Sequence, residues 1–111
     1  MQNVKIYFLN NSELSEVEAL HKGYRGDVYV KTVPDNIYHL HVYDIIRLKQ
    51  DFETEIEHYG FFEIEPNVIL VKEVTSINIK QTVEKLFARK FFDSLKQIKD
   101  FEINLNTLFE S

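Results

Sequence analysis

The sequence predicts a single α+β domain with a mainly antiparallel sheet of about five strands. Short segments rich in β-branched and aromatic residues alternate apolar and polar positions, which is the pattern of half-buried strands. Two longer segments repeat apolar residues every three or four positions, which predicts two main helices packed on the sheet. The elements follow in the order strand, short helix, two strands, helix, two strands, helix, as in α+β domains. The 111 residues fit one domain spanning 1–111.

The composition predicts aromatic side chains on the surface. The chain has nine Phe and six Tyr, and 44% of its residues are hydrophobic. A core of this size has no room for all of these rings, so part of the aromatic surface is expected to be exposed. Exposed aromatic surface is common at protein interfaces.

Several kinds of chemistry lack the residues that they need. The chain has no cysteine, which excludes disulfides and thiolate sites, and its three glycines cannot form a phosphate-binding loop. No serine has a recognisable base partner, so we expect no catalytic residue and no cofactor. The sequence has no signal-peptide pattern and no apolar run of about 18 residues, which favours a soluble cytoplasmic protein.

The chain begins with a strand and a segment that has two interpretations. Residues 4–9 are β-branched and aromatic and predict a strand. Ser12 is then a suitable N-cap for a helix that would end at Gly23. Positions 17, 19 and 21 also alternate as a strand would. Both interpretations stay open, with the helix preferred.

Residues 27–33 and 37–43 predict a β-hairpin. The sequence Pro34-Asp35-Asn36 between them is a turn, because proline fixes φ and Asp or Asn side chains bond back to the main chain. In the second strand, alternation defines two faces: Tyr38, Leu40 and Val42 on one, and Ile37, His39, His41 and Tyr43 on the other.

The first long helix is predicted between Asp44, a suitable N-cap, and Gly60, at the C-terminal position where glycine is favoured. Its apolar stripe consists of Ile45, Leu48, Phe52, Ile56 and Tyr59. We expect this stripe to pack on the sheet.

Residues 60–71 predict a second hairpin. Phe62 and Ile64 alternate with their neighbours as in a half-buried strand, and Pro66-Asn67 then forms a tight turn. Residues 68–71 are apolar on both faces, which predicts a central strand.

The second long helix begins after Thr75 or Asn78, either of which is a suitable cap. Its apolar stripe ends at Arg89 or continues to about Lys99. The last residues, 100–111, predict an edge strand or a tail, since positions 101, 103 and 105 are apolar and alternate with polar ones.

Charge is unevenly distributed along the chain. The net charge is −5, the first long helix is acidic, and residues 76–99 carry six basic and two acidic side chains. A negative protein disfavours nucleic acid as a partner, and no membrane partner is expected. We expect the basic helix to face acidic parts of its own fold or of a second subunit.

His39 and His41 are the most specific candidate for a metal site in the sequence. On one strand face their imidazoles would lie about 7 Å apart, which suits two ligands of one metal. A third ligand, by residue type, would be His21, His58, Glu63 or Glu65. The alternative is a histidine pair beside Tyr43 on a solvated or dimer-covered sheet face.

The candidate interaction residues lie on the helices, the sheet and the predicted second hairpin. Glu63 and Glu65 would share one strand face, either as an acidic patch or as its solvated side. The remaining candidates are Tyr43, Asp51, Glu55, Lys85 and Arg89.

Three functions fit these observations. The preferred one is a non-catalytic protein-interaction domain that associates with itself through aromatic and charged surface. The second is an acidic inhibitor, such as an immunity protein, because negative faces accelerate the capture of basic partners. The third is a metal-binding enzyme that uses His39 and His41.

Overall fold

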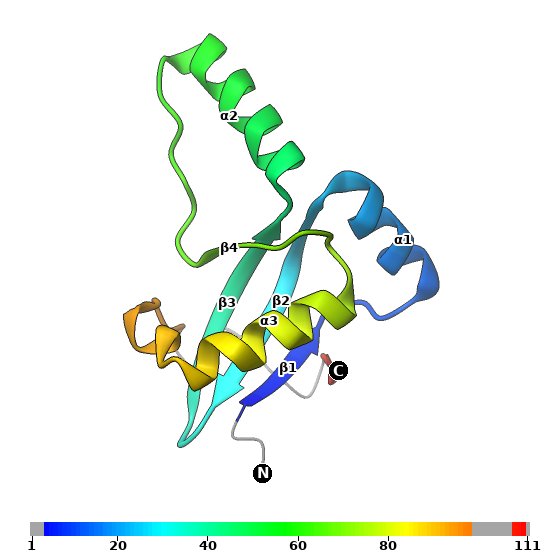
Figure 1. The fold of residues 1–111 in the computed structure, drawn as a ribbon, viewed down its shortest axis with the longest axis vertical. Helices are drawn as coiled ribbons and strands as arrows, with labels where there is room; N and C mark the ends of the chain where they lie inside the picture. Colours follow the sequence, from blue (N-terminus) through cyan, green and yellow to red (C-terminus); the bar gives the residue numbers. More distant parts are fainter. Residues whose placement is uncertain (1–3, 99–107, 111) are drawn as a thin grey trace.

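The computed structural model describes residues 4–98 and 108–110, which form a five-stranded sheet with helices around it (Figure 1). In order across the sheet the strands are β4 (Val68–Leu70), β3 (Asn36–Tyr43), β2 (Tyr24–Thr32), β1 (Val4–Phe8) and β5 (Phe109–Glu110). All neighbouring pairs are antiparallel except β3 and β4, which are parallel. The predicted α+β fold with a mainly antiparallel sheet is confirmed, and the parallel pair is new.

The helices in the described residues are α1 (Glu13–Lys22), α2 (Ile45–Tyr59), α3 (Ser76–Ala88) and the short 3₁₀ helix η1 (Phe91–Ser94). The segment with two interpretations is therefore a helix. Each α-helix begins at a predicted N-cap whose side chain accepts a backbone N–H: Ser12, Asp44 and Thr75.

The ends of the helices also follow local backbone chemistry. Gly23 and Gly60 end α1 and α2 with φ of 68° and 79°, in the left-handed region that favours glycine. Helix α3 ends at Ala88, and Lys90, with φ of 60°, redirects the chain into η1. Of the two predicted ends of this helix, the one at Arg89 is correct.

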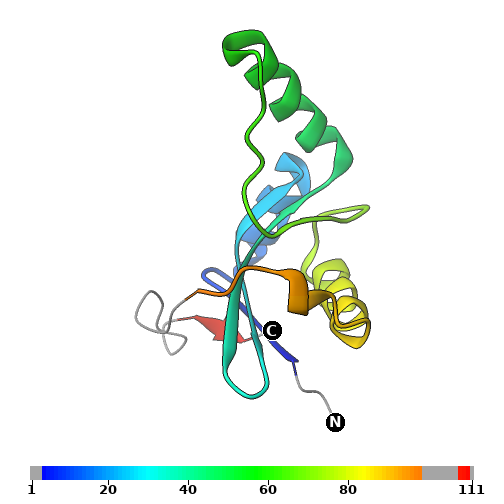
Figure 2. The same ribbon diagram turned by 90° about the vertical axis from the view of Figure 1, so that its left-hand side faces the viewer.

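The core lies between one face of the sheet and α3, which crosses the strands in Figure 1 and lies on one side of the sheet in Figure 2. Alternate residues of the three central strands point to it, as the period of two requires. The buried residues of this cluster include Ile6, Val28, Val30, Leu40 and Val42 from the strands and Ile79 and Val83 from α3.

The predicted second hairpin is wrong. Residues 60–65 form no strand, and β4 is an edge strand, not a central one, that pairs in parallel with β3. Asn67 does adopt the left-handed conformation, with φ of 60°. Its side chain donates to the carbonyls of His39 and Lys96 and accepts from the Lys96 N–H, so it anchors the chain to β3 and does not close a hairpin.

The prediction that both long helices pack on the sheet is also wrong. Helix α3 does so, but α2 contains no buried residue and extends beyond the end of the sheet (Figure 1). The α2 pattern is amphipathic, but the described residues cover its apolar stripe only in part, mainly where Phe62 packs on Phe52.

The C-terminal prediction is testable only in part. The alternating positions 101, 103 and 105 lie outside the described residues. Phe109 and Glu110 do form a short edge strand, paired with Phe8 and Tyr7 of β1. In residues 4–98 and 108–110, no helix combines the length and the apolar character that a membrane span requires.

Candidate functional site

The most exposed part of the fold is α2 with the following segment 60–65, which we call the arm. The helix is locally well formed, since Asp44 Oδ1 accepts the Arg47 N–H at 2.8 Å and the Gly60 N–H donates to the Ile56 carbonyl at 2.9 Å. However, Phe52 is 48% exposed and Tyr59 is 69% exposed. The arm therefore presents apolar side chains that its own described chain leaves uncovered.

The tip of the arm, residues 59–64, is aromatic. The rings of Tyr59 and Phe61 lie 6.4 Å apart between centroids, and Phe61 is 61% exposed. Behind them, Phe62 meets Phe52 edge to face at 6.0 Å, so segment 60–65 folds back along α2. This contact gives the arm its own small apolar interior and leaves Tyr59, Phe61 and Ile64 outside.

The arm is also strongly acidic. Residues 51–65 contain six Asp or Glu side chains and no Lys or Arg. Asp51 pairs with Arg47 within the helix at 3.0 Å, whereas Glu63 is exposed in the return segment. The predicted interaction residues Asp51, Glu55 and Glu63 thus belong to one element, although Glu63 is not on a strand.

The predicted histidine pair lies at the base of the arm. His39 and His41 share the sheet face opposite the core, with ring centroids 4.5 Å apart. Glu65, where the return segment reaches the sheet, places Oε2 2.6 Å from His41 Nδ1. Because the carboxylate accepts, Nδ1 carries the proton, and the Tyr24 hydroxyl lies 3.1 Å from the same nitrogen.

The surroundings favour the neutral forms of His41 and Tyr43. Burial lowers the pKa of His41 below 6.5, the Glu65 carboxylate opposes this effect, and His39 adds to it. Burial, with Glu65 and Tyr24 nearby, raises the pKa of Tyr43 to about 12. Near pH 7 the contact between the arm and the sheet is therefore a hydrogen bond from a neutral imidazole to a carboxylate.

The structure places one acidic side chain, Glu65, beside the histidine pair, but it shows no complete set of metal ligands there. In residues 4–98 and 108–110, no three His, Asp or Glu side chains are grouped to hold a metal ion. His39 Nε2 lies 2.5 Å from the Gly26 carbonyl and donates to it, and His41 Nδ1 faces Glu65. Metal binding by the pair stays a prediction.

The predicted basic residues lie far from the arm in the same chain. Lys85 is in the last turn of α3 and Arg89 is its C-cap, and both are exposed. In Figure 1 this end of α3 lies toward the β2–β3 hairpin, while the arm occupies the opposite end. The structure does not join the acidic and basic candidates within one chain.

A pocket of about 450 Å³ lies beside these basic residues. It is formed by the end of the β2–β3 hairpin, the last turn of α3 and η1. Its lining includes Val33, Tyr38, Phe87, Ala88, Lys90, Phe92 and Asp93. Tyr38 and Phe92 are each only 3% exposed, so they form an aromatic floor.

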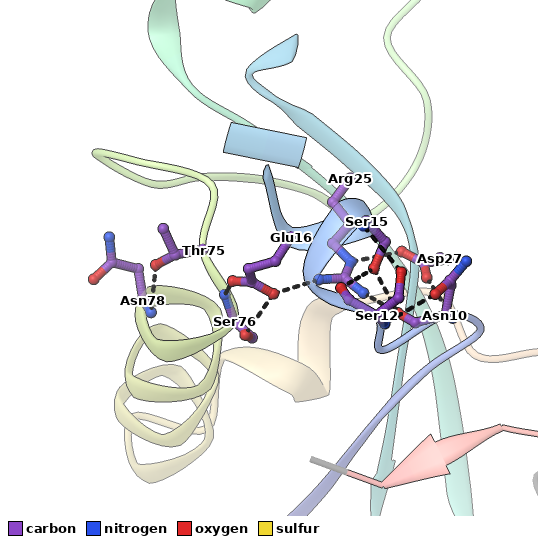
Figure 3. Close-up of polar contacts among 9 residues, drawn as sticks. All are labelled: Asn10, Ser12, Ser15, Glu16, Arg25, Asp27, Thr75, Ser76 and Asn78. Atoms are coloured by element: carbon purple, nitrogen blue, oxygen red, sulfur yellow. Dashed lines mark hydrogen bonds and ion pairs between the residues drawn. The ribbon is translucent and has the colours of Figure 1, made fainter. Parts of the chain in front are cut away.

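A partly buried polar network around Arg25, which sequence reasoning missed, joins three elements (Figure 3). Arg25 is only 5% exposed, and its guanidinium pairs with Asp27 at 2.8 Å and with Glu16 at 3.2 Å. Glu16 in turn accepts the Ser76 N–H at 2.6 Å and the Ser76 hydroxyl at 2.8 Å. The network therefore ties α1 to β2 and to the start of α3.

The charge of Glu16 is stabilised by these partners. Burial raises the pKa of this carboxyl, but the two Ser76 donors and the Arg25 guanidinium outweigh it and hold the pKa below its usual 4.5. The only local signal in the sequence was an acidic residue two positions after Arg25. Because each of these side chains has a partner, we interpret the network as structural.

Comparisons with protein-family models, with curated proteins and with solved structures found no match to this chain.

Proposed function

We propose that this protein is a non-catalytic interaction domain that associates with itself through the arm. The observation that carries the proposal is that α2 has an apolar stripe and not one buried residue. A lone helix of this length is marginal in water, so most of the stability of such a helix comes from packing on a partner. A partner surface would supply that packing.

The free energies of apolar burial and of association indicate that a stable interface must include more than α2. Full burial of one large apolar side chain contributes about 1.5–3 kcal/mol. The arm offers seven such side chains, but each is only 39–69% exposed, so each would contribute about half of that value. Association itself costs on the order of 4–15 kcal/mol. Burial of the arm only just offsets that cost, so a second contact is needed for a stable complex.

Charge on the same chain supports a second copy as the partner. The arm is acidic over residues 51–65, and residues 85–96 carry four basic side chains and one acidic one. Opposite charges on two surfaces of one chain become complementary when two copies meet. A foreign partner would need to supply that basic surface itself.

Sedimentation velocity on the full chain tests the proposal. As the concentration is raised to about 100 µM, we expect a dimer to form, with twice the 13.2 kDa of one chain. Phe52→Asp places a charge in the apolar stripe and should yield monomers. Thr54→Asp makes a similar change on the opposite side of the same helix and should leave the dimer intact.

Two results would contradict the proposal. One is a wild-type chain that sediments as a monomer over the whole range, at low and at high salt. The other is a Phe52→Asp variant that keeps its circular dichroism spectrum and dimerises as the wild type does.

A further inference from the structure

The pocket near the hairpin has the chemistry to bind an aromatic side chain. Its floor rings, Tyr38 and Phe92, meet edge to face with centroids 5.0 Å apart, and Phe87 lies 6.4 Å from Phe92. Its volume, about 450 Å³, falls in the range of protein pockets that hold small ligands. A further ring docked over this cluster, mainly against the half-buried Phe87, would find the edge-to-face or offset contact that aromatic groups prefer.

One basic and one acidic side chain line the pocket, and two further basic side chains lie nearby on the same end of α3. Lys90 lines the pocket, Arg89 is next to it, and Lys85 lies one turn earlier on α3. Asp93 is the acidic member of the lining. The sequence around the pocket thus favours an aromatic group flanked by carboxylates.

The tip of the arm has this composition. Tyr59 and Phe61 are 69% and 61% exposed, and Glu57 and Glu63 flank them in the sequence. The tip offers rings for the aromatic side of the pocket, and carboxylates for Lys90 and the neighbouring Lys85 and Arg89.

The tip and the pocket of one chain lie toward opposite ends of the molecule. Both views place the arm at one end of the longest axis, which measures 44 Å, and the hairpin at the other (Figures 1 and 2). A tip can therefore enter only the pocket of another copy. If two copies lie side by side and antiparallel, each tip meets the other's pocket, and the two-fold pairing closes.

We infer that the arm tip of one copy docks its aromatic side chains in the hairpin-end pocket of a second copy, making two equivalent contacts in an antiparallel dimer. This inference rests on the proposed self-association and adds the surface that receives the arm. It also supplies the second contact that the energetics of the arm require.

Filling the pocket tests the inference directly. Ala88 lines the pocket from an exposed position, so Ala88→Trp should occupy it with little effect on the fold. We expect this change to raise the dimer Kd at least about tenfold in sedimentation velocity. Gln81→Trp, at an exposed position of the same helix outside the pocket, should leave the Kd within about twofold.

Val33→Glu provides a second variant on the other wall. Val33 is 56% exposed on the hairpin, and a carboxylate there would repel the acidic tip. We expect about the same loss of affinity from this change as from Ala88→Trp. Matching melting temperatures for both variants and the wild type would show that the fold is retained.

Complementation between two variants identifies the contact. A chain with Tyr59→Asp and Phe61→Asp has an intact pocket, and the Ala88→Trp chain has an intact tip. Each homodimer would keep no intact contact, whereas the mixture keeps one, so the mixture should associate more tightly than either variant alone and more weakly than the wild type. A mixture that associates no better than the separate chains would overturn the inference.

The results also separate the two proposals. If the wild type dimerises and Phe52→Asp weakens the dimer, but Ala88→Trp and Val33→Glu do not, the pocket is not the receiving surface and only this inference fails. If the wild type is a monomer throughout, the proposed function fails with it.

Discussion

Arg25 keeps its positive charge although the side chain is nearly fully buried. A buried charge is costly unless it is paired and hydrogen-bonded, and here Glu16, Asp27 and the Asn10 carbonyl all accept from the guanidinium. The Phe8 ring lies 4.0 Å from its central carbon and covers one side. If any one of these partners is removed, the buried Arg25 guanidinium is no longer fully paired.

Glu16→Gln should lower the free energy of unfolding by about 1–3 kcal/mol at pH 7, because Arg25 loses a charged partner and Ser76 loses a charged acceptor. Urea denaturation measures this loss. Glu13→Gln in the same first turn, at an exposed position, should cost no more than about 0.5 kcal/mol. Equal losses in the two variants would contradict the role assigned to the network.

The Glu16 contribution should depend on pH in a defined direction. The pKa of Glu16 in the folded state lies below 4.5, so the unfolded state binds the proton first as the pH falls. The contribution is therefore complete above pH 4.5 and disappears as the pH drops through the folded pKa. The difference between wild type and Glu16→Gln should narrow over that interval, and a constant difference would count against the ion pair.

His41→Gln should remove a separate pH dependence. Since burial holds the folded pKa of His41 below 6.5, the unfolded state takes up the proton first, and wild-type stability should decline as the pH falls below 6.5. Urea midpoints between pH 7 and pH 5 would show a smaller decline for His41→Gln than for the wild type. His58→Gln, exposed on the arm, serves as the control and should keep the wild-type slope.

Among the elements, α1 and α2 both end at a glycine in the left-handed conformation, but the two glycines have different surroundings. A Cβ at Gly60 would meet no atom within 4 Å, whereas a Cβ at Gly23 would lie 2.5 Å from Asp44 Oδ1. Asp44 caps α2, so crowding at Gly23 disturbs the end of one helix and the start of the next. The arm therefore depends on the packing at its base more than on its own C-terminal cap.

Gly23→Ala should accordingly destabilise the protein more than Gly60→Ala. Each substitution places an alanine in the left-handed region, at about 1–2 kcal/mol. At Gly23 the displaced cap should add about 0.5–2 kcal/mol. At Gly60 the loss should appear as reduced helix content of the arm, because α2 is not part of the core. Circular dichroism during urea denaturation checks this order, and the reverse order would contradict it.

Local chemistry explains which elements the sequence could predict. Ser12, Asp44, Gly23 and Gly60 mark helix ends through contacts within a few residues, and these four predictions are correct. Of the two candidate caps of the next helix, Thr75 and Asn78, the structure uses Thr75. The partner of β4 depends on residues far along the chain, so its parallel pairing with β3 left no local pattern. Similarly, the α2 stripe shows that the helix is amphipathic but not what covers it.

For the candidate site, too, the sequence predicted the features set by local residues and missed those that depend on distant ones. Strand alternation placed His39 and His41 on one face, as the structure confirms. It could not place Glu65 beside His41, because that contact depends on the return path of the arm. The pocket and the Arg25 network are also non-local, since each joins elements separated by tens of residues.

At the scale of the whole molecule, the described residues form a packed body and an arm whose helix contains no buried residue. The body has a sheet covered by α3, and the arm extends beyond it with apolar and acidic side chains exposed (Figure 1). The pocket at the opposite end is lined by aromatic rings, with Lys90 in its lining and Lys85 and Arg89 on the same end of α3. Two copies side by side and antiparallel would cover both surfaces.

Amide hydrogen exchange at low and high protein concentration tests this account most directly, because it reports which backbone segments a partner covers. We predict that α2 exchanges much faster than β2 and β3 in dilute solution. As the concentration rises through the dimer Kd, protection should increase in the arm and in residues 86–93, with little change in β2 and β3. The account would be contradicted if the chain dimerises while protection of the arm stays constant. It would also be contradicted if protection increases only in other segments.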